Sequence, residues 1–286
     1  MLPYISEYYT NPASIYSPSR MVSKRVEEAR KLIAGTIGAE ASEIYFTSGG
    51  SESDNWAIKK IMISRMNKGK HMITTKVEHH AVLESCKYLE SLGFEVTYLN
   101  VNEDGLIDLN ELENSIREDT ILVSIMAANN EIGTLMPLKE IGDICKKHKV
   151  LFHTDAVQAY GNIPIDVNEM NIDLLSTSAH KIEGPKGIGF LYVRKGVMIT
   201  PLISGGMQEK GKRAGTTNAA GIIGFAKACE LKFSEIKKNN EYVLNLREHL
   251  IDRVLSEIPY VRLNGSRDKR LVGNANFSFQ FIEGEG

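Results

Sequence analysis

Apolar residues recur in two alternating patterns along the first three quarters of the chain. Between Ser19 and Ile37 they return every three or four residues, which predicts an amphipathic helix that Gly38 ends. Short apolar runs bounded by turn residues predict strands. We expect strands at 43–47, 72–75, 94–99, 121–126, 150–154, 172–176 and 189–193, and helices at 19–37, 53–67, 80–92, 109–116 and 138–148.

The alternation of strands and helices predicts an α/β fold. Strands separated by helices of this length pair in parallel through right-handed crossovers, with helices on both faces of the sheet. We expect a large α/β domain at 19–217, preceded by a loop segment at 1–18. Residues 219–258 are helical in pattern with a polar break at 237–241, and strands follow at 261–263 and 276–281. Two strands with one helical stretch predict an incomplete small α+β domain at 218–286.

Composition narrows the classes of function. The chain has 286 residues, 24% of them charged, and its net charge of -2 gives no electrostatic reason to expect nucleic acid or an anionic membrane as partner. The start of the chain lacks the pattern of a signal peptide, and the apolar run at 121–128 is too short to span a bilayer. Three scattered cysteines favour a reducing setting. We therefore expect a soluble, cytoplasmic protein.

Polar clusters follow the predicted strands. They are Gly49-Gly50-Ser51, Glu78-His79-His80, Asn129-Asn130-Glu131, His153-Thr154-Asp155 with Gln158, and Ser178-Ala179-His180-Lys181. Each has a plain alternative: a helix cap, a turn, an exposed histidine, or, for Asp155, the N-cap of a short helix at 156–160. Because the carboxyl ends of parallel strands face one crevice, we expect the clusters to converge there.

The residue types in these clusters are the parts of a pyridoxal phosphate (PLP) site. A lysine in such a crevice can lose its proton and form a Schiff base with a carbonyl cofactor. A glycine-rich helix start suits a phosphate, and a carboxylate can hold a protonated pyridine nitrogen. A metal-dependent hydrolase using His79, His80, His153 and Asp155 is the remote alternative.

Seven motifs carry a resemblance to a known family. They are Thr47-Ser48-Gly49-Gly50-Ser51-Glu52-Ser53-Asp54-Asn55, Glu78-His79, Val123-Ser124-Ile125-Met126 with Asn129-Asn130-Glu131-Ile132-Gly133, His153-Thr154-Asp155-Ala156-Val157-Gln158, Ser178-Ala179-His180-Lys181, Gly184-Pro185-Lys186-Gly187, and Arg213-Ala214-Gly215-Thr216. In this order they resemble the cysteine desulfurases of nitrogen fixation and iron–sulfur cluster assembly, which are class V aminotransferases of the fold-type I PLP architecture. The resemblance runs from residue 11 to residue 285.

The resemblance implies a role for each matching residue. Lys181 would be the Schiff-base lysine, Asp155 would pair with the pyridine nitrogen, and His79 would stack on the ring and transfer protons. The remaining contacts would come from Asn130 and Gln158 at the ring hydroxyl, from Gly50, Ser51, Ser178 and His180 at the phosphate, and from Thr216 of a second subunit, also at the phosphate. The implied protein is a homodimer that converts L-cysteine to L-alanine and passes sulfur, as a persulfide, to an iron–sulfur scaffold or tRNA-thiolation protein.

The resemblance also implies that segments of the family are missing at both ends. Beyond Glu283-Gly284-Glu285 the family carries a mobile-loop cysteine that attacks the substrate sulfur and an arginine that binds the substrate carboxylate. Cys86, Cys145 and Cys229 lie mid-helix by pattern, and we expect none of them to replace that nucleophile. We therefore expect little desulfurase activity from this chain, with an inactive PLP-binding fragment or one half of a split enzyme as the alternatives.

Overall fold

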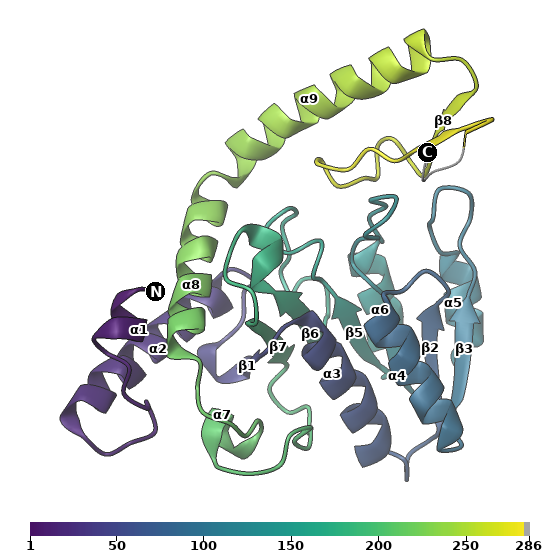
Figure 1. Cartoon of the computed structure of the whole chain (residues 1–286). Coiled ribbons are helices and arrows are strands. Elements are labelled where there is room, and N and C mark those ends of the chain that lie inside the picture. Colours follow the sequence, from purple (N-terminus) through teal and green to yellow (C-terminus); the bar gives the residue numbers. More distant parts are fainter. Residues whose placement is uncertain (283–286) are drawn as a thin grey trace.

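A seven-stranded sheet forms the centre of the protein (Figure 1). The computed structural model describes residues 1–282. The strands are β1 (Ile44–Thr47), β2 (His71–Thr75), β3 (Glu95–Leu99), β4 (Thr120–Ser124), β5 (Leu151–Asp155), β6 (Leu174–Ser178) and β7 (Gly189–Val193). Their order across the sheet is β1-β7-β6-β5-β4-β2-β3.

The sheet is mostly parallel, as the sequence predicts. Strands β6, β5, β4, β2 and β3 pair in parallel, whereas β7 is antiparallel to both of its neighbours. Only residues 179–188 connect β6 to β7, and they hold a single 3-10 turn, η2 (Ala179–Ile182). That connection is too short for a parallel crossover, so β7 returns beside β6 in the opposite direction.

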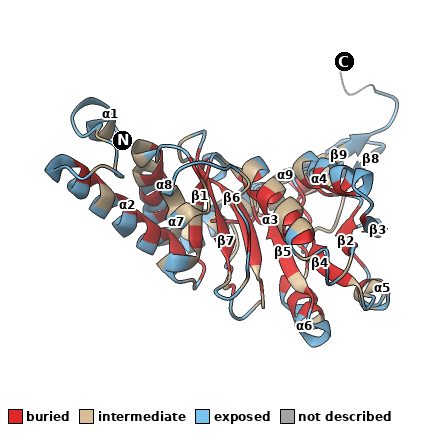
Figure 2. Cartoon of the chain, turned by 90° about the horizontal axis from the view of Figure 1, so that it is seen from below, coloured by how far each residue is buried: buried red, intermediate tan, exposed pale blue. Residues whose placement is uncertain are grey.

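Helices cover both faces of the sheet and bury its strands (Figure 2). The helices α3 (Gly50–Ser64) and α4 (His80–Ser91) pack on one face, with Trp56 and Leu89 in the core. The opposite face is covered by α2 (Ser17–Gly35), α5 (Leu109–Ser115), α6 (Leu138–His148) and α8 (Ala219–Ser234). Every residue of β2, β4, β6 and β7 is buried, as expected of strands with helices on both sides.

Two predictions were wrong: the loop at 1–18 and the position of the break near residue 237. The expected loop at 1–18 contains a one-turn helix, α1 (Pro3–Ser6), and α2 begins within it at Ser17. Both helices have a proline in the first turn, where its missing N–H costs no hydrogen bond and its fixed φ favours a helix. The predicted break at 237–241 lies inside α9 (Ile236–Glu257), and the chain turns at Glu235 instead. Residues 237–239 are exposed, so their polarity is compatible with a solvated helix face.

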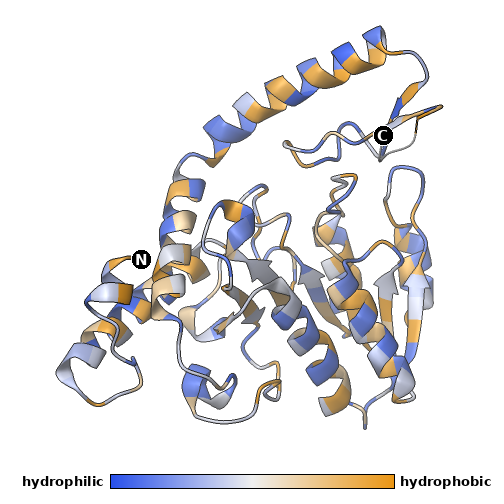
Figure 3. Ribbon diagram, in the orientation of Figure 1, coloured by the Kyte–Doolittle hydropathy of each residue, from blue (hydrophilic) through white to orange (hydrophobic). Residues whose placement is uncertain are grey.

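The chain after α8 extends past the sheet along the long helix α9, where hydrophobic and hydrophilic residues alternate (Figure 3). It ends in an antiparallel pair of short strands, β8 (Val261–Leu263) and β9 (Phe277–Phe279), the second shorter than expected. The Glu283-Gly284-Glu285 motif lies outside the described residues. Within residues 1–282, no helix combines the length and apolar character needed to cross a membrane.

The segment between β7 and α8 is tied to α2 and α3 by two ion pairs and to β1 by a hydrogen bond. It contains the short helix α7 (Gln208–Gly211), where the buried carboxylate of Glu209 accepts hydrogen bonds from both terminal nitrogens of Arg30, at 2.6 and 2.8 Å, and from the Phe46 N–H at 3.0 Å. The last bond satisfies an N–H of the edge strand β1. Further along, the Arg213 guanidinium binds the Glu52 carboxylate at 2.9 Å. The segment is therefore fixed just before Thr216.

Candidate functional site

A pocket of about 220 Å³ lies beyond the carboxyl ends of the central strands. It is lined by Gly50, Ser51, Asp54, His79, Met126, Ala128, Asn130, Asp155, Val157, Gln158, Ser178, His180 and Lys181. These residues follow β1, β2, β4, β5 and β6 along the chain. The structure thus brings together every residue expected to bind PLP except Thr216, and the reason is the shared direction of these strands.

One wall of the pocket is the start of α3. The first hydrogen bond of this helix runs from the Ser53 N–H to the Gly49 carbonyl, so the N–H groups of the residues between them have no helical acceptor. A β-carbon on Gly50 would lie 2.5 Å from Cγ2 of Val157, so glycine is needed where α3 meets the end of β5. Free N–H groups at a helix start form a site for an anion.

Ser178, at the end of β6, and His180, in η2, face this helix start. The Ser178 hydroxyl lies 2.7 Å from Nδ1 of His180, and burial lowers the pKa of the histidine. A β-carbon on Gly49 would come to 3.5 Å from the Ser178 hydroxyl, which shows how closely β6 approaches the turn before α3. Hydroxyl, imidazole and helix N–H groups therefore converge on one end of the pocket.

Lys181 enters the pocket from η2, directly after β6. The turn is closed by the Gly184 N–H, which donates to the Ala179 carbonyl at 2.9 Å, while Glu183 has a left-handed φ of 64°. A single tight turn therefore places an exposed lysine beside the buried end of the sheet.

Asp155 forms the opposite side of the pocket at the end of β5. Its Oδ1 accepts the Val157 N–H at 2.9 Å, and the residues after it form a turn instead of the short helix considered from sequence. Burial raises the pKa of Asp155, while the Val157 N–H and, across the pocket, His79 and Lys181 act in the other direction. His79 caps α4: its Nδ1 accepts the Ala81 N–H at 3.1 Å.

The residues of the hydrolase alternative do not meet. His80 is exposed in the first turn of α4 and lies outside the pocket lining. His153 is fully buried between the hydroxyls of Ser124, at 2.8 Å, and Ser176, at 3.0 Å, and burial lowers its pKa to about 3. Its ring is therefore a neutral hydrogen-bonding part of the sheet, and only His79 and Asp155 of the four reach the pocket.

Comparison with known proteins agrees with this geometry. The profile of the class-V aminotransferases matches residues 1–285. The chain belongs to this family. It is 56% identical over 285 residues to the cysteine desulfurase IscS of Methanosarcina thermophila, covering all of this chain and 70% of that protein.

Solved structures of cysteine desulfurase relatives have the same fold. A NifS-like protein superposes with a TM-score of 0.96 at 40% identity, over 99% of this chain and 78% of the other. A structure described as SspA in complex with cysteine superposes with a TM-score of 0.85, also at 40% identity, over 97% of this chain and 78% of the other. The chain therefore has the fold-type I architecture of the PLP-dependent class-V aminotransferases.

The pocket fits the cofactor of this family. PLP carries a phosphate, a basic ring nitrogen and an aldehyde, and the pocket offers one suitable group for each. The start of α3 with Ser178 suits the phosphate, the buried carboxyl of Asp155 suits the ring nitrogen, and the amine of Lys181 suits the aldehyde.

Sequence reasoning assigned no role to Glu78, which holds the His79 loop in place. Its Oε1 accepts the Thr75 hydroxyl at 2.8 Å and the Met126 N–H at 3.0 Å, which joins the ends of β2 and β4. Burial raises the pKa of Glu78 to about 8. Its position next to His79 was the one available signal, because burial of a glutamate depends on packing that the sequence does not display.

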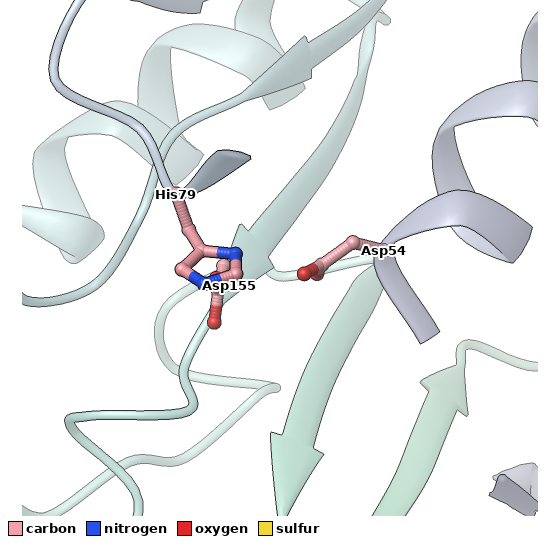
Figure 4. A group of neighbouring side chains, drawn as sticks. All are labelled: Asp54, His79 and Asp155. Atoms are coloured by element: carbon pink, nitrogen blue, oxygen red, sulfur yellow. The ribbon is translucent and has the colours of Figure 1, made fainter. Parts of the chain in front are cut away.

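Asp54 was missed for the same reason. It belongs to the motif at the start of α3, yet a charged residue there normally indicates a solvated helix face. The structure buries it at the floor of the pocket, where Asp54, His79 and Asp155 each place a side-chain N or O atom within 4.8 Å of the others (Figure 4).

Thr216 and the cysteines lie elsewhere. Thr216 is exposed, beyond Arg213 and outside the pocket lining of its own chain. Cys86, Cys145 and Cys229 are buried in α4, α6 and α8, as predicted, and burial raises the pKa of each thiol to about 12. These thiols are therefore protonated and inaccessible at neutral pH.

The cofactor-free protein should become less stable as pH rises. We expect this loss of stability to be smaller in the variant Glu78→Gln. Folded Glu78 keeps its proton up to about pH 8, whereas the unfolded residue releases it near its ordinary pKa of 4.5. The free energy of unfolding therefore falls as pH increases through this window, by on the order of a few kcal/mol. Glutamine keeps the Oε1 acceptor and has no proton to lose.

Urea unfolding of the cofactor-free protein at pH 5, 6.5 and 8 measures this difference. The matched control is Glu84→Gln, because Glu84 is exposed on α4 and outside the pocket. We expect the control to follow the wild-type pH dependence. An unchanged slope in Glu78→Gln would show that Glu78 ionises normally in the folded protein.

Proposed function

We propose that the chain binds PLP through Lys181 and acts on L-cysteine as a cysteine desulfurase, giving L-alanine and transferring the sulfur to a thiol. The observation that carries the proposal is the pocket itself. A lysine, a buried aspartate and a free helix start lie on different sides of one cavity, and each suits a different group of PLP: the aldehyde, the ring nitrogen and the phosphate. The family match and the similarity to SspA, whose structure was solved in complex with cysteine, support the choice of substrate.

Asp155 controls the charge of the ring nitrogen in this proposal. Bound PLP supplies an electron sink for negative charge on the substrate carbon beside the amino group. A carboxylate next to the nitrogen favours its protonated form and so strengthens the sink. The Val157 N–H fixes one carboxylate oxygen of Asp155. The other oxygen can accept a hydrogen bond from the protonated ring nitrogen.

His79 is suited to stacking on the ring and to moving protons. Because its Nδ1 accepts the Ala81 N–H, the neutral ring carries its proton on Nε2. Glu78 and Asn129 hold the loop before it: the Asn129 amide donates to the Val77 carbonyl at 3.1 Å. His79 and Lys181 together supply the acid and base groups of the reaction.

The remaining contacts complete the cofactor site. Gly50, Ser51, Ser178 and His180 bind the phosphate, and Asn130 and Gln158 bond the ring hydroxyl. The Asn130 amide now donates to the Glu131 carboxylate at 2.6 Å, so this contact requires that amide to turn toward the pocket.

The sulfur acceptor in this proposal is a thiol other than those of Cys86, Cys145 and Cys229, which are buried away from the pocket. Delivery to an iron–sulfur scaffold or tRNA-thiolation protein would follow, and the three unpaired thiols suit a cytoplasmic setting. The second candidate is the alternative considered from sequence: an inactive PLP-binding form or one half of a split enzyme. The chain spans about 70% of the length of its M. thermophila relative.

Replacing Lys181 by alanine tests the cofactor part of the proposal. We expect Lys181→Ala to lose the yellow absorbance after PLP loading and desalting, because the aldehyde then has no amine partner in the pocket. The control Lys195→Ala removes a lysine that is exposed beyond β7, and we expect it to remain yellow. L-cysteine should change the absorbance of the control and of the wild type.

The outcomes separate the candidates. Wild-type PLP retention by Lys181→Ala would contradict the assignment of this lysine. A spectral change with L-cysteine but without sulfide release, even with an added thiol, would favour the PLP-binding form that lacks sulfur transfer.

Thr216 supports a homodimer in which each subunit completes the other's phosphate site. It is exposed on its own chain, and the Arg30–Glu209 and Arg213–Glu52 pairs hold its segment in place. A hydroxyl presented from a fixed segment suits a contact with a second subunit.

Mixing two variants tests this arrangement. We expect Thr216→Ala to weaken PLP binding about tenfold, as loss of a hydrogen bond to a charged group does. In mixed dimers of Thr216→Ala and Lys181→Ala, one site regains both residues, so wild-type affinity should return at that site. Thr217→Ala is the matched control and should bind PLP normally. Failure of mixing to restore affinity would contradict a contribution of Thr216 across the dimer.

A further inference from the structure

A second buried carboxyl group lies beside Asp155 at the floor of the pocket. Asp54 extends from the second turn of α3, and its exposed fraction is 1%, against 6% for Asp155. The two carboxyl groups and the His79 ring each contribute an atom within 4.8 Å of the others. Figure 4 shows Asp54 reaching from its helix toward Asp155, at the end of β5, and His79, on the loop before α4.

Within residues 1–282, no lysine or arginine forms an ion pair with Asp54. Its Oδ1 has no hydrogen-bond partner among residues 1–282. Nε2 of His153 lies 3.6 Å from this oxygen, but that ring is neutral and is held by Ser124 and Ser176. Burial favours the protonated acid and has a larger effect on the pKa of Asp54 than the hydrogen bond with Ser176, which favours the ionised form.

Asp155 is placed differently. His79 and Lys181 face it across the pocket and favour its charged form. A charge on the third buried carboxyl, Glu78, opposes ionisation of Asp54. Burial, followed by the charge of Asp155, holds the pKa of Asp54 well above its usual range. Two carboxyl groups this close cannot both ionise easily, and they titrate as a pair.

We infer that Asp54 is a positioning residue for the cofactor ring: in the cofactor-free protein its carboxyl shares one proton with Asp155, so the pair carries a single negative charge until a positively charged ring nitrogen favours its further ionisation. The inference rests on the proposed function, because it assigns Asp155 to that nitrogen. Asp54 acts through Asp155. Its proton limits the negative charge of the pocket before loading, and the pair can then ionise further beside a cationic nitrogen.

The inference has a measurable consequence in proton release. A positive charge beside the pair favours its ionisation, so part of the shared proton should pass to the ring nitrogen or to solvent when PLP binds. The wild-type protein should therefore release more protons, or take up fewer, than a protein without the shared proton. The substitution Asp54→Asn removes this proton but keeps the shape and an N–H donor for Asp155. Other proton changes on PLP binding are the same in both proteins, so their difference isolates the pair.

Calorimetric titration with PLP at pH 7, in buffers of different ionisation enthalpy, measures the protons released. We expect Asp54→Asn to release fewer protons than wild type, by up to about one per PLP, while its affinity stays within about threefold. The control Asp173→Asn makes the same change at the opposite end of β6, where Asp173 binds Arg194, and should match wild type. Equal release by Asp54→Asn and wild type would overturn the inference.

Two other outcomes are possible: loss of PLP binding in the control proteins, and failure of Asp54→Asn to fold. If wild type and Asp173→Asn fail to bind PLP, the proposed function itself is wrong, and this is seen before any proton count. If Asp54→Asn does not fold, an NMR titration of the side-chain carboxyl carbons in the cofactor-free wild type replaces the calorimetry. The variant Asp155→Asn then identifies the signal of Asp155. Joint titration of two aspartates above the normal range supports the pair, and separate ionisation of both below about pH 5 overturns it.

Discussion

The common direction of β2, β4, β5 and β6 is the constraint on which the site depends. Helices cover both faces of these strands, so polar side chains find space mainly where the strands end. Parallel pairing brings those ends to one edge, and residues far apart in sequence meet there. The antiparallel β7 serves the same site, because its short connection to β6 contains Lys181.

The sequence predicts the fold and most of the pocket because both depend on local patterns. Apolar runs identify the strands, and the polar residues that follow them, such as Asp155 and Lys181, need only the sheet rule to be brought together. The burial of Asp54 and Glu78 at the site was not predicted, because a sequence does not distinguish a buried carboxylate from an exposed one. The turn at Glu235 was missed because a polar run is compatible with both a break and a solvated helix face.

Three buried carboxyl groups give the site its chemical character at some expense of stability. Glu78 connects two strand ends, Asp155 faces the pocket, and Asp54 adjusts the charge of Asp155 in our inference. Burial raises the pKa of all three, so the cofactor-free protein is destabilised as they ionise at higher pH. Carboxyl groups with pKa values raised in this way are typical of functional sites, where a positively charged ligand can stabilise their ionised form.

The most direct test of the central claim is to identify the lysine that carries the cofactor. PLP-loaded protein is reduced with borohydride and digested, and the peptide with the added pyridoxyl mass is sequenced by mass spectrometry. The convergence of strand ends on one pocket predicts a single labelled peptide, modified at Lys181. Labelling at another lysine, or scattered over exposed lysines with Lys181 unmodified, would contradict it.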